Sequence, residues 1–328
     1  MVLTENPVIN RIRASLREQT RANIHEVTFH AMGTPCRMLF RATPQLASAF
    51  SSEALCWVAD FEARYSRFLP DSLISRINAA AGQHWVETDP ETDRLLALCH
   101  ELNFITQGVF DPTSLPLIRL WDWKANPPRI PEDEAIAATL RLVGWRKLQR
   151  APGKVFLPEP GMALDFGGVG KEYAVDQVSA LAVARGIADV LVDFGADVRV
   201  QGTPPEGRGA WHIGLQDPKQ PSRCWGSVAV QNAAVATSGD YLRCFTANGR
   251  RYGHILDVRT GRPVENGCLA VSIISPSCTR AGMLATTAFV LGPQAGLHLI
   301  DSTFQAEGCI ITEQNRLTSK RFYDHFVS

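Results

Sequence analysis

The stretch that decides the fold is LDFGGVGKEYAVD, residues 164–176. An apolar approach ends at Asp165, a run of glycines follows, and a helix is predicted from Lys171. Glycines let a backbone approach a ligand closely, and the first turn of a helix offers free N–H groups to a phosphate. The stretch is neither a Walker loop nor a GxGxxG motif, because Glu172 follows the lysine and the glycines are spaced differently. Taken alone, it indicates either a phosphate-binding turn or a plain tight turn.

Helices and strands are predicted on both sides of this stretch. The predicted strands are 27–40 with an interruption at 33–35, 188–202 with a central glycine turn, 211–216, 226–231, 270–275 and 306–313. The predicted helices are 51–65 capped by Ser51 or Ser52, 91–107 ended by Gly108, 171–185 ended by Gly186, and 279–291 ended by Gly292. Helices packed on mixed, mainly antiparallel strands give an α+β fold.

Composition excludes several classes of protein. The chain of 328 residues has 33 basic and 33 acidic side chains, so it lacks the basic excess typical of a nucleic-acid-binding protein. The 8 cysteines form no CxxC pair, which argues against structural zinc and against a disulfide framework. We find no apolar stretch of membrane-spanning length, and no signal peptide or lipobox, so a cytoplasmic protein is expected. Residues 1–24 are expected to form a polar helical arm ahead of one domain over 25–328.

A second candidate stretch is ATSGDYLRCFTANGRRYGHILDVRTGRPVEN, residues 236–266. His254 precedes an apolar pair and then Asp257. A histidine moves protons near neutral pH, and a nearby carboxylate orients its ring. A lone histidine in a folded chain is also commonly structural, and the residues alone leave both interpretations open.

Two further stretches and one loop are open to a structural or a functional interpretation. GVFDPTSLPLIRLWDW at 108–123 offers Trp121 and Trp123 either as packing or as an aromatic wall for a flat ring. ARYSRFLPDSLISRIN at 63–78 is a turn between helices that could serve packing alone. The proline-rich residues 124–134 are a surface excursion or a lid.

Taken together and in chain order, these stretches resemble the ApbE-like FAD:protein FMN transferases. The matching pieces are MGT at 32–34, YSRF with SLISRIN, VFDP with LIRLW, LDFGGVGKEYAVD, the FGADV turn, ATSGDY, HILDVRTGRPV, and the closing helix that ends in VLG. The resemblance covers about residues 27–313. It implies an internally duplicated α+β fold and a magnesium-dependent enzyme. Such an enzyme cleaves FAD, attaches FMN through a phosphoester to a Thr or Ser hydroxyl of a target protein, and releases AMP.

The resemblance also implies roles for individual residues. It places catalytic groups at His254, Lys171 and Asp257, with His254 as the first candidate for the base. It places FAD contacts at Met32, Tyr65, Val109, Phe110, Asp111, Asp165, Lys171 and Ile255. It places magnesium ligands at the carbonyl of Gly168 and the hydroxyl of Thr286.

This chain departs from the family pattern at two positions. Val258 stands where the family's HxxDP pattern has proline, which mainly affects loop stiffness. The family's metal-binding pattern near the last helix is A-D-A-x-[AD]-T, whereas RAGMLATTAFVLG at 280–292 has Gly282 at the acidic position and Ala285 at the alternative one. Magnesium usually takes one or two carboxylates, so this change is expected to weaken its binding.

Three functions therefore remain open at the level of sequence. The first is FMN transfer, with the metal held by Gly168, Thr286, the FAD phosphates and waters, or with its charge supplied by Lys171 or Arg280. The second is a flavin-binding or regulatory protein without transferase activity. The third is an FAD pyrophosphatase that releases FMN and AMP to water. The partner expected for the first function is a protein that carries an acceptor Thr or Ser, with no nucleic acid involved.

Overall fold

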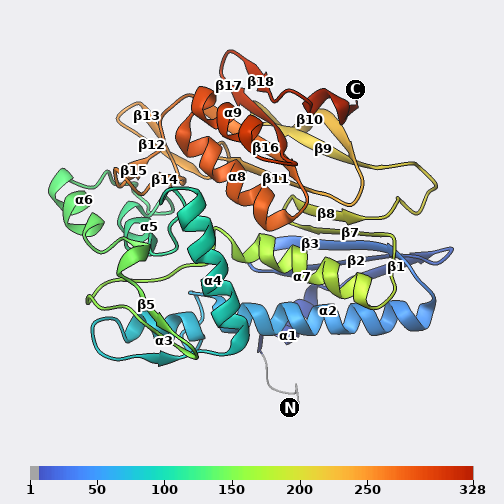
Figure 1. Ribbon diagram of the computed structural model, residues 1–328, viewed down its shortest axis with the longest axis horizontal. Helices are drawn as coiled ribbons and strands as arrows, with labels where there is room; N and C mark the ends of the chain where they lie inside the picture. The colour runs from blue at the N-terminus through green and yellow to red at the C-terminus, as the bar shows by residue number, and fades with distance from the viewer. Residues whose placement is uncertain (1–6, 328) are drawn as a thin grey trace.

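A nine-stranded antiparallel sheet forms the centre of the computed structural model, which describes residues 7–327 (Figure 1). Its strands, in order across the sheet, are β1 (Arg17–Arg21), β2 (Ile24–Ala31), β3 (Thr34–Arg41), β7 (Val190–Phe194), β8 (Asp197–Gln201), β11 (Ala234–Gly239), β16 (Cys268–Ser275), β17 (Glu307–Thr312) and β18 (Arg316–Thr318). Every neighbouring pair in this order is antiparallel. The order of the strands shows an internal repeat.

Each half of the sheet is built as a hairpin, a pair of helices and a second hairpin. In the first half, β2 and β3 precede α2 (Pro44–Tyr65) and α7 (Gly170–Ala184), which lead into β7 and β8. In the second half, β11 and β16 precede α8 (Cys278–Leu291) and α9 (Pro293–Ser302), which lead into β17 and β18. The halves join where β8 pairs with β11. This arrangement agrees with the predicted α+β fold and its internal duplication.

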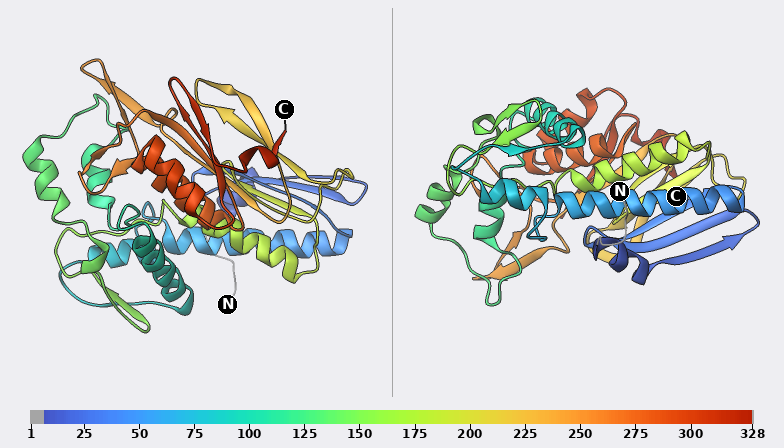
Figure 2. Two further views of the ribbon diagram at one scale, coloured as in Figure 1. Left: turned by 45° about the horizontal axis from the view of Figure 1, so that its top comes forward. Right: turned by 90° about the horizontal axis from the view of Figure 1, so that it is seen from below.

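The helices cover one face of the sheet, and a smaller sheet covers the other. A large core unites the helices with alternate strand residues such as Phe40, Val192 and Ile273. The opposite strand residues, among them Val200 and Val235, pack with β9 (Trp211–Asp217), β10 (Gln220–Val230), the short helix η2 (Phe322–Asp324) and β19 (Phe326–Val327). The alternation follows from the period of two in a strand. Figure 2 shows the long helix α2 running along the helical face.

The long connection between α2 and α7 folds at one end of the sheet (Figure 1). It holds α3 (Leu73–Ala79), β4 (Val86–Glu87), α4 (Pro90–Ile105), α5 (Leu115–Trp121), α6 (Asp133–Leu140), η1 (Trp145–Lys147), β5 (Gln149–Ala151) and β6 (Lys154–Phe156). Two hairpins from the second half lie at the same end, formed by β12 (Cys244–Ala247) with β13 (Arg250–Gly253) and by β14 (Leu256–Asp257) with β15 (Arg262–Pro263). The predicted loop at 124–134 has no helix or strand until α6 begins.

The structure corrects two of the predicted elements. The helical arm predicted over 1–24 is wrong for its later part: the helix α1 spans Pro7–Ser15, and β1 takes up Arg17–Arg21. Residues 1–6 of the predicted arm lie outside the described residues. The helix is not a polar arm either, because Val8, Ile9 and Ile12 are buried in the main core.

The predicted cap of α2 is also wrong. The helix begins at Pro44, where the Thr43 side chain accepts a hydrogen bond from the N–H of Leu46. Ser51 lies buried within the helix. Phe50 and Ala47 extend the apolar face toward the N-terminus, and proline suits the first position of a helix because its missing N–H is not needed there. Within the described chain, no helix is both long enough and apolar enough to cross a bilayer.

Candidate active site

The glycine-rich turn at 164–176 brings most of the predicted residues to the N-terminal end of α7. Gly167 and Gly168 are exposed, and the helix begins at Gly170, whose N–H donates to the carbonyl of Phe166. The backbone N–H of Asp165 donates to the Pro112 carbonyl at 2.9 Å, so the VFDP stretch lies alongside. A Cβ atom on Gly168 would lie 3.6 Å from the ring of Phe110.

Lys171, in the first turn of α7, forms an ion pair with Asp197. Asp197 comes from the glycine turn between β7 and β8 and is 4% exposed. A buried carboxylate beside the lysine fixes its ammonium group close to the helix N-terminus. Asp197 was missed from the sequence, although the turn that carries it, FGADV, had been recognised.

Asp165 is held by Arg67, with 3.1 Å between the guanidinium and the carboxylate. Burial raises the pKa of Asp165, and the positive charge of Arg67 partly opposes this rise. Arg67 lies in the YSRF stretch, for which the sequence leaves a structural and a functional interpretation open. The ion pair shows that this turn brings a positive charge to the predicted site.

Asp111 has a different role from that of a free nucleotide ligand. Its carboxylate accepts hydrogen bonds from the N–H and hydroxyl of Thr113 and from the N–H of Trp145. Burial raises the pKa of Asp111 against the effect of these bonds. One carboxylate oxygen therefore closes the local turn at Thr113, and the other ties this turn to Trp145 in η1.

Two predicted flavin contacts lie at the edge of the core. Tyr65 is 5% exposed, and its hydroxyl shares a hydrogen bond with Thr92. Met32 sits at the turn between β2 and β3 with a φ of +50°, and its N–H donates to the carboxylate of Glu62 at 2.8 Å. The Met32 side chain is half-buried, whereas the Tyr65 ring packs against Phe166.

His254 is placed before β14 with an imidazole that is poorly solvated. Its Nδ1 atom is buried and has no hydrogen-bond partner in the described chain. Burial, and then the charge of Arg243, lower the pKa of His254 to about 4. The ring is therefore neutral at pH 7 and can accept a proton. Trp123 lies beside it with a ring-to-ring distance of 6.3 Å, and Ile255 next to it is half-buried against the main core.

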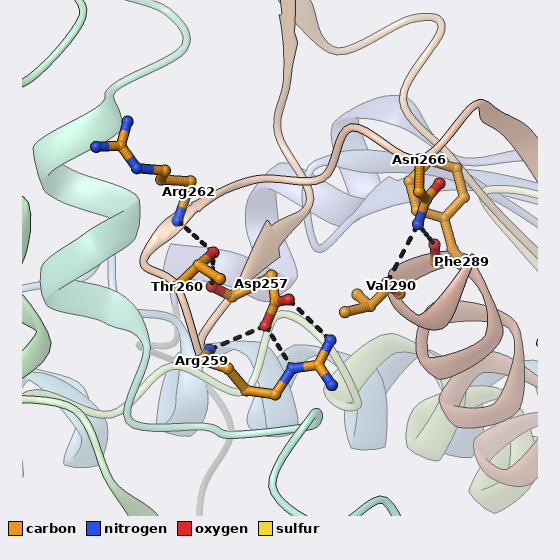
Figure 3. Close-up of polar contacts among 7 residues, drawn as sticks. All are labelled: Asp257, Arg259, Thr260, Arg262, Asn266, Phe289 and Val290. Carbon is orange, nitrogen blue, oxygen red and sulfur yellow. Dashed lines mark hydrogen bonds and ion pairs between the residues drawn. The ribbon is translucent and has the colours of Figure 1, made fainter. Parts of the chain in front are cut away.

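The expected pair between His254 and Asp257 does not form. Asp257 instead holds Arg259 through both oxygens, at 2.8 Å to Nε and 2.8 Å to Nη2, and also accepts the Arg259 N–H (Figure 3). These bonds close the loop that also contains Thr260 and Arg262. Further along, Asn266 donates to the carbonyls of Phe289 and Val290 and so anchors this segment to the end of α8 (Figure 3).

The other tryptophan of the LWDW stretch serves packing. Trp121 is 4% exposed, donates to the carbonyl of Gly261 at 2.7 Å and stacks on Tyr252. It joins α5 to the hairpin loops of the second half. These contacts favour the packing interpretation of Trp121.

The two predicted metal ligands lie on facing segments. Thr286, on α8, shares a hydrogen bond of 2.7 Å with Ser238 at the end of β11. Gly168 precedes α7, and its carbonyl accepts no hydrogen bond within the described chain. Glu172, one turn beyond Gly168, packs against Gly282: a Cβ on that glycine would lie 2.7 Å from its Cγ and 2.9 Å from its Oε1. The Oε2 atom of Glu172 is buried and has no hydrogen-bond partner among residues 7–327.

A cavity of about 750 Å³ opens between α4, α7, α8 and α9. Its lining is largely apolar, with Leu102, Tyr173, Met283 and Leu299 among the residues that form it. Val109 and Arg259 also border it, so it meets the predicted site at one edge. The remaining predicted contacts do not line this cavity.

The fold and the site together define a flavin-transferase-like α+β protein. Residues 32–310 match the family model of the ApbE family, and the chain belongs to this family. Among curated proteins, the chain is 28% identical to the FAD:protein FMN transferase of Vibrio cholerae over 83% of this chain and 82% of that protein. It is 29% identical to the FAD:protein FMN transferase of Treponema pallidum over 88% of this chain and 83% of that protein.

Solved structures of ApbE proteins have the same fold as this chain. The flavin transferase ApbE from Vibrio cholerae superposes with a TM-score of 0.82 at 25% identity, covering 94% of this chain and 99% of that one. The ApbE protein from Thermotoga maritima superposes with a TM-score of 0.83 at 29% identity, covering 92% of this chain and 98% of that one. The resemblance stated from motifs is thereby confirmed.

Proposed function

We propose that this chain is an FAD:protein FMN transferase. It would cleave the pyrophosphate of FAD, attach FMN through a phosphoester to a Thr or Ser hydroxyl of a target protein, and release AMP. The observation that carries the proposal is the match over residues 32–310, together with relatives named as FAD:protein FMN transferases that align over most of their length. The grouping of Lys171, Asp165 and the open glycine turn at the N-terminus of α7 supports it.

The reaction needs positive charge near the pyrophosphate and a hydroxyl that loses its proton. The free N–H groups at the start of α7 and the ammonium of Lys171 supply positive charge. The hydroxyl oxygen of the acceptor attacks the phosphorus of the FMN half, and the bond to the AMP oxygen breaks. The candidate to take the hydroxyl proton is the imidazole of His254, which burial keeps neutral and whose Nδ1 has no partner among the described residues.

We propose Mg²⁺ as the metal of the site, held by the carbonyl of Gly168 and the hydroxyl of Thr286. When bound, it would neutralise charge on the phosphate oxygens. The described residues hold no cluster of three or more His, Cys, Asp or Glu side chains, so a cation here must rely on few protein ligands, phosphates and water. Magnesium is bound in this way by many phosphate-processing enzymes. The carboxylate oxygen of Glu172 beside Gly282, which has no partner among residues 7–327, supports this proposal.

The test is a product analysis with the purified full-length protein. It is incubated with FAD, Mg²⁺ and an acceptor domain that carries Thr or Ser, and the products are followed by intact-protein mass and AMP release. An added FMN mass with equimolar AMP is expected. AMP with free FMN would indicate a pyrophosphatase instead. Tight FAD binding without either product would indicate a flavin-binding protein and would overturn the proposal.

A further inference from the structure

Helices α7 and α8 face each other in an antiparallel register that can be followed contact by contact. At the N-terminus of α8, the carboxylate of Asp176 accepts hydrogen bonds from the N–H of Cys278 at 2.8 Å and the N–H of Thr279 at 2.9 Å. One turn back along α7 and one turn forward along α8, Glu172 contacts Gly282. Gly168 lies two residues before the first residue of α7, and Thr286 lies four residues beyond Gly282 on α8. Residues four apart lie on one face of a helix, so Gly282 and Thr286 share one face of α8, and Glu172 contacts the first of them.

The carboxylate of Glu172 has no counter-charge of its own. Asp176 is paired with Arg199 and caps α8, and Lys171 is paired with Asp197. Glu172 has no ion pair or side-chain hydrogen bond within residues 7–327, and its Oε2 is buried. Burial of a carboxylate oxygen without a partner is unfavourable, because its lost hydration is not replaced by another interaction. The site therefore lacks a positively charged partner.

Neither Lys171 nor Arg280 supplies the positive charge that the Glu172 carboxylate lacks. The ammonium of Lys171 is engaged by Asp197, and side chains adjacent in a helix sequence do not face each other. The guanidinium of Arg280 donates to the carbonyl of Phe304 at 2.5 Å, at the end of α9. A small hard cation with oxygen ligands fits the remaining groups: the Glu172 carboxylate, the Thr286 and Ser238 hydroxyls, and the open Gly168 carbonyl.

We infer that Glu172 supplies the carboxylate ligand of the divalent-cation site and does so from α7, through the space left by the missing side chain of Gly282. The inference rests on the proposed function for the role of the cation, and on the contacts of α7 and α8 for its place. Gly282 has a role in this arrangement because a side chain there would collide with Glu172. The lost acidic residue on α8 is thus replaced by one on the facing helix.

Cation binding is measured directly, with Mn²⁺ as the probe and the electron paramagnetic resonance signal of free Mn²⁺ as the readout. Purified full-length protein is titrated with and without FAD. Glu172→Gln keeps the size of the side chain and removes its charge, and it is expected to weaken Mn²⁺ binding by at least ~10-fold. Glu101→Gln, an exposed glutamate on α4, is the matched control and should bind Mn²⁺ as the wild type does.

A second variant distinguishes the loss of a cation ligand from damage to the fold, because it moves the carboxylate to the facing helix. Glu172→Ala combined with Gly282→Asp moves the carboxylate from α7 to α8 within the same gap. This double variant should bind Mn²⁺ within a few-fold of the wild type, whereas Glu172→Ala alone should not. A second readout is the thermal shift: Mg²⁺ should raise the Tm of the wild type and of the double variant, but not of Glu172→Gln.

The outcomes separate this inference from the proposed function. Wild-type Mn²⁺ affinity in Glu172→Gln, no Mn²⁺ binding by the wild type, or failure of the relocated carboxylate to restore binding would each overturn the inference. Cation binding through Glu172 without FMN transfer would leave the inference standing and reject the function. If the wild type transfers FMN and Glu172→Gln binds the cation as tightly as the wild type, the proposed function stands and the inference is rejected.

Discussion

At the scale of single residues, His254 has an environment that holds its imidazole neutral. Its pKa of about 4 in the folded chain lies below the ordinary histidine value of 6.5, because burial and Arg243 disfavour the charged form. Between these two values, the unfolded chain takes up a proton that the folded chain does not. The contribution of His254 to stability is therefore complete above pH 6.5 and is lost as the pH falls toward 4.

Replacing this histidine should flatten the acid side of the stability profile. From pH 7 to pH 4, the wild type should lose up to about 3 kcal/mol more than His254→Gln, and less if water reaches the ring. Urea unfolding at a series of pH values measures the difference. His212→Gln, on an exposed residue of β9, should leave the profile unchanged. Parallel profiles for the wild type and His254→Gln would contradict the prediction.

Variants of the Lys171–Asp197 ion pair distinguish the effect of Lys171 on stability from its effect on activity. Lys171→Met leaves the buried Asp197 carboxylate unpaired and should lower the free energy of unfolding by about 1–3 kcal/mol, allowing for the partial exposure of the lysine. The double variant Lys171→Met with Asp197→Asn removes that buried charge and should regain most of the stability. AMP release should stay low in both, because neither restores the positive charge near the phosphates. Recovery of activity in the double variant would count against a role for Lys171.

At the scale of elements, replacing Gly282 of helix α8 tests how closely this helix packs against α7. Gly282→Ala removes a helix-weakening glycine, which is worth up to about 1 kcal/mol, but its Cβ would collide with the side chain of Glu172. A flexible side chain can move aside, so the free energy of unfolding should change by less than about 1 kcal/mol while Mn²⁺ affinity falls.

A second helical glycine provides the contrast. Gly296→Ala, on α9, would bring its Cβ within 2.5 Å of the backbone carbonyl of Ala288, which cannot move aside in the same way. It should lower the free energy of unfolding by about 1–3 kcal/mol. The result that contradicts the argument is equal destabilisation by the two changes, measured by urea unfolding.

Elements with strong local signals were predictable from sequence. The helices over 171–185 and 279–291 were placed within a residue of α7 and α8, because each ends at a glycine that stops the apolar pattern. The N-terminal segment could not be predicted from the sequence, because a short helix such as α1 and a polar edge strand such as β1 lack a distinctive pattern.

The contacts that join the residues of the candidate site could not be predicted from the sequence. Lys171 with Asp197, Arg67 with Asp165, and Glu172 with Gly282 each join residues from different elements. Local spacing cannot show such contacts. It also suggested an Asp257–His254 pair that the structure replaces with Asp257–Arg259, because a carboxylate two residues before an arginine can bind it within one turn.

At the scale of the whole molecule, the two halves of the repeat share one core. Their strands meet at the short β8–β11 ladder, where Ala234 pairs with Arg199 and Val235 with Val198. The core under the helices nevertheless runs without a break from α1 and α2 of the first half to α8 and α9 of the second. Packing across the junction, more than the ladder, is expected to hold the halves together.

The chain should therefore unfold in one step despite its internal repeat. Far-UV circular dichroism and tryptophan fluorescence should give coincident urea transitions, because neither half can open without exposing the core of the other. Two separated transitions would show that the halves are independent folding units. The measurement needs only the wild-type protein.

The facing of α7 and α8 also constrains how this family can change over time. Positions 172 and 282 share one small volume, so a side chain at position 282 would displace the glutamate at position 172. A substitution at either position therefore changes the space that is left for the side chain at the other. Comparing proteins of this fold by the acidic side chains of both helices, and not by those of α8 alone, would count the carboxylate that this chain carries at Glu172.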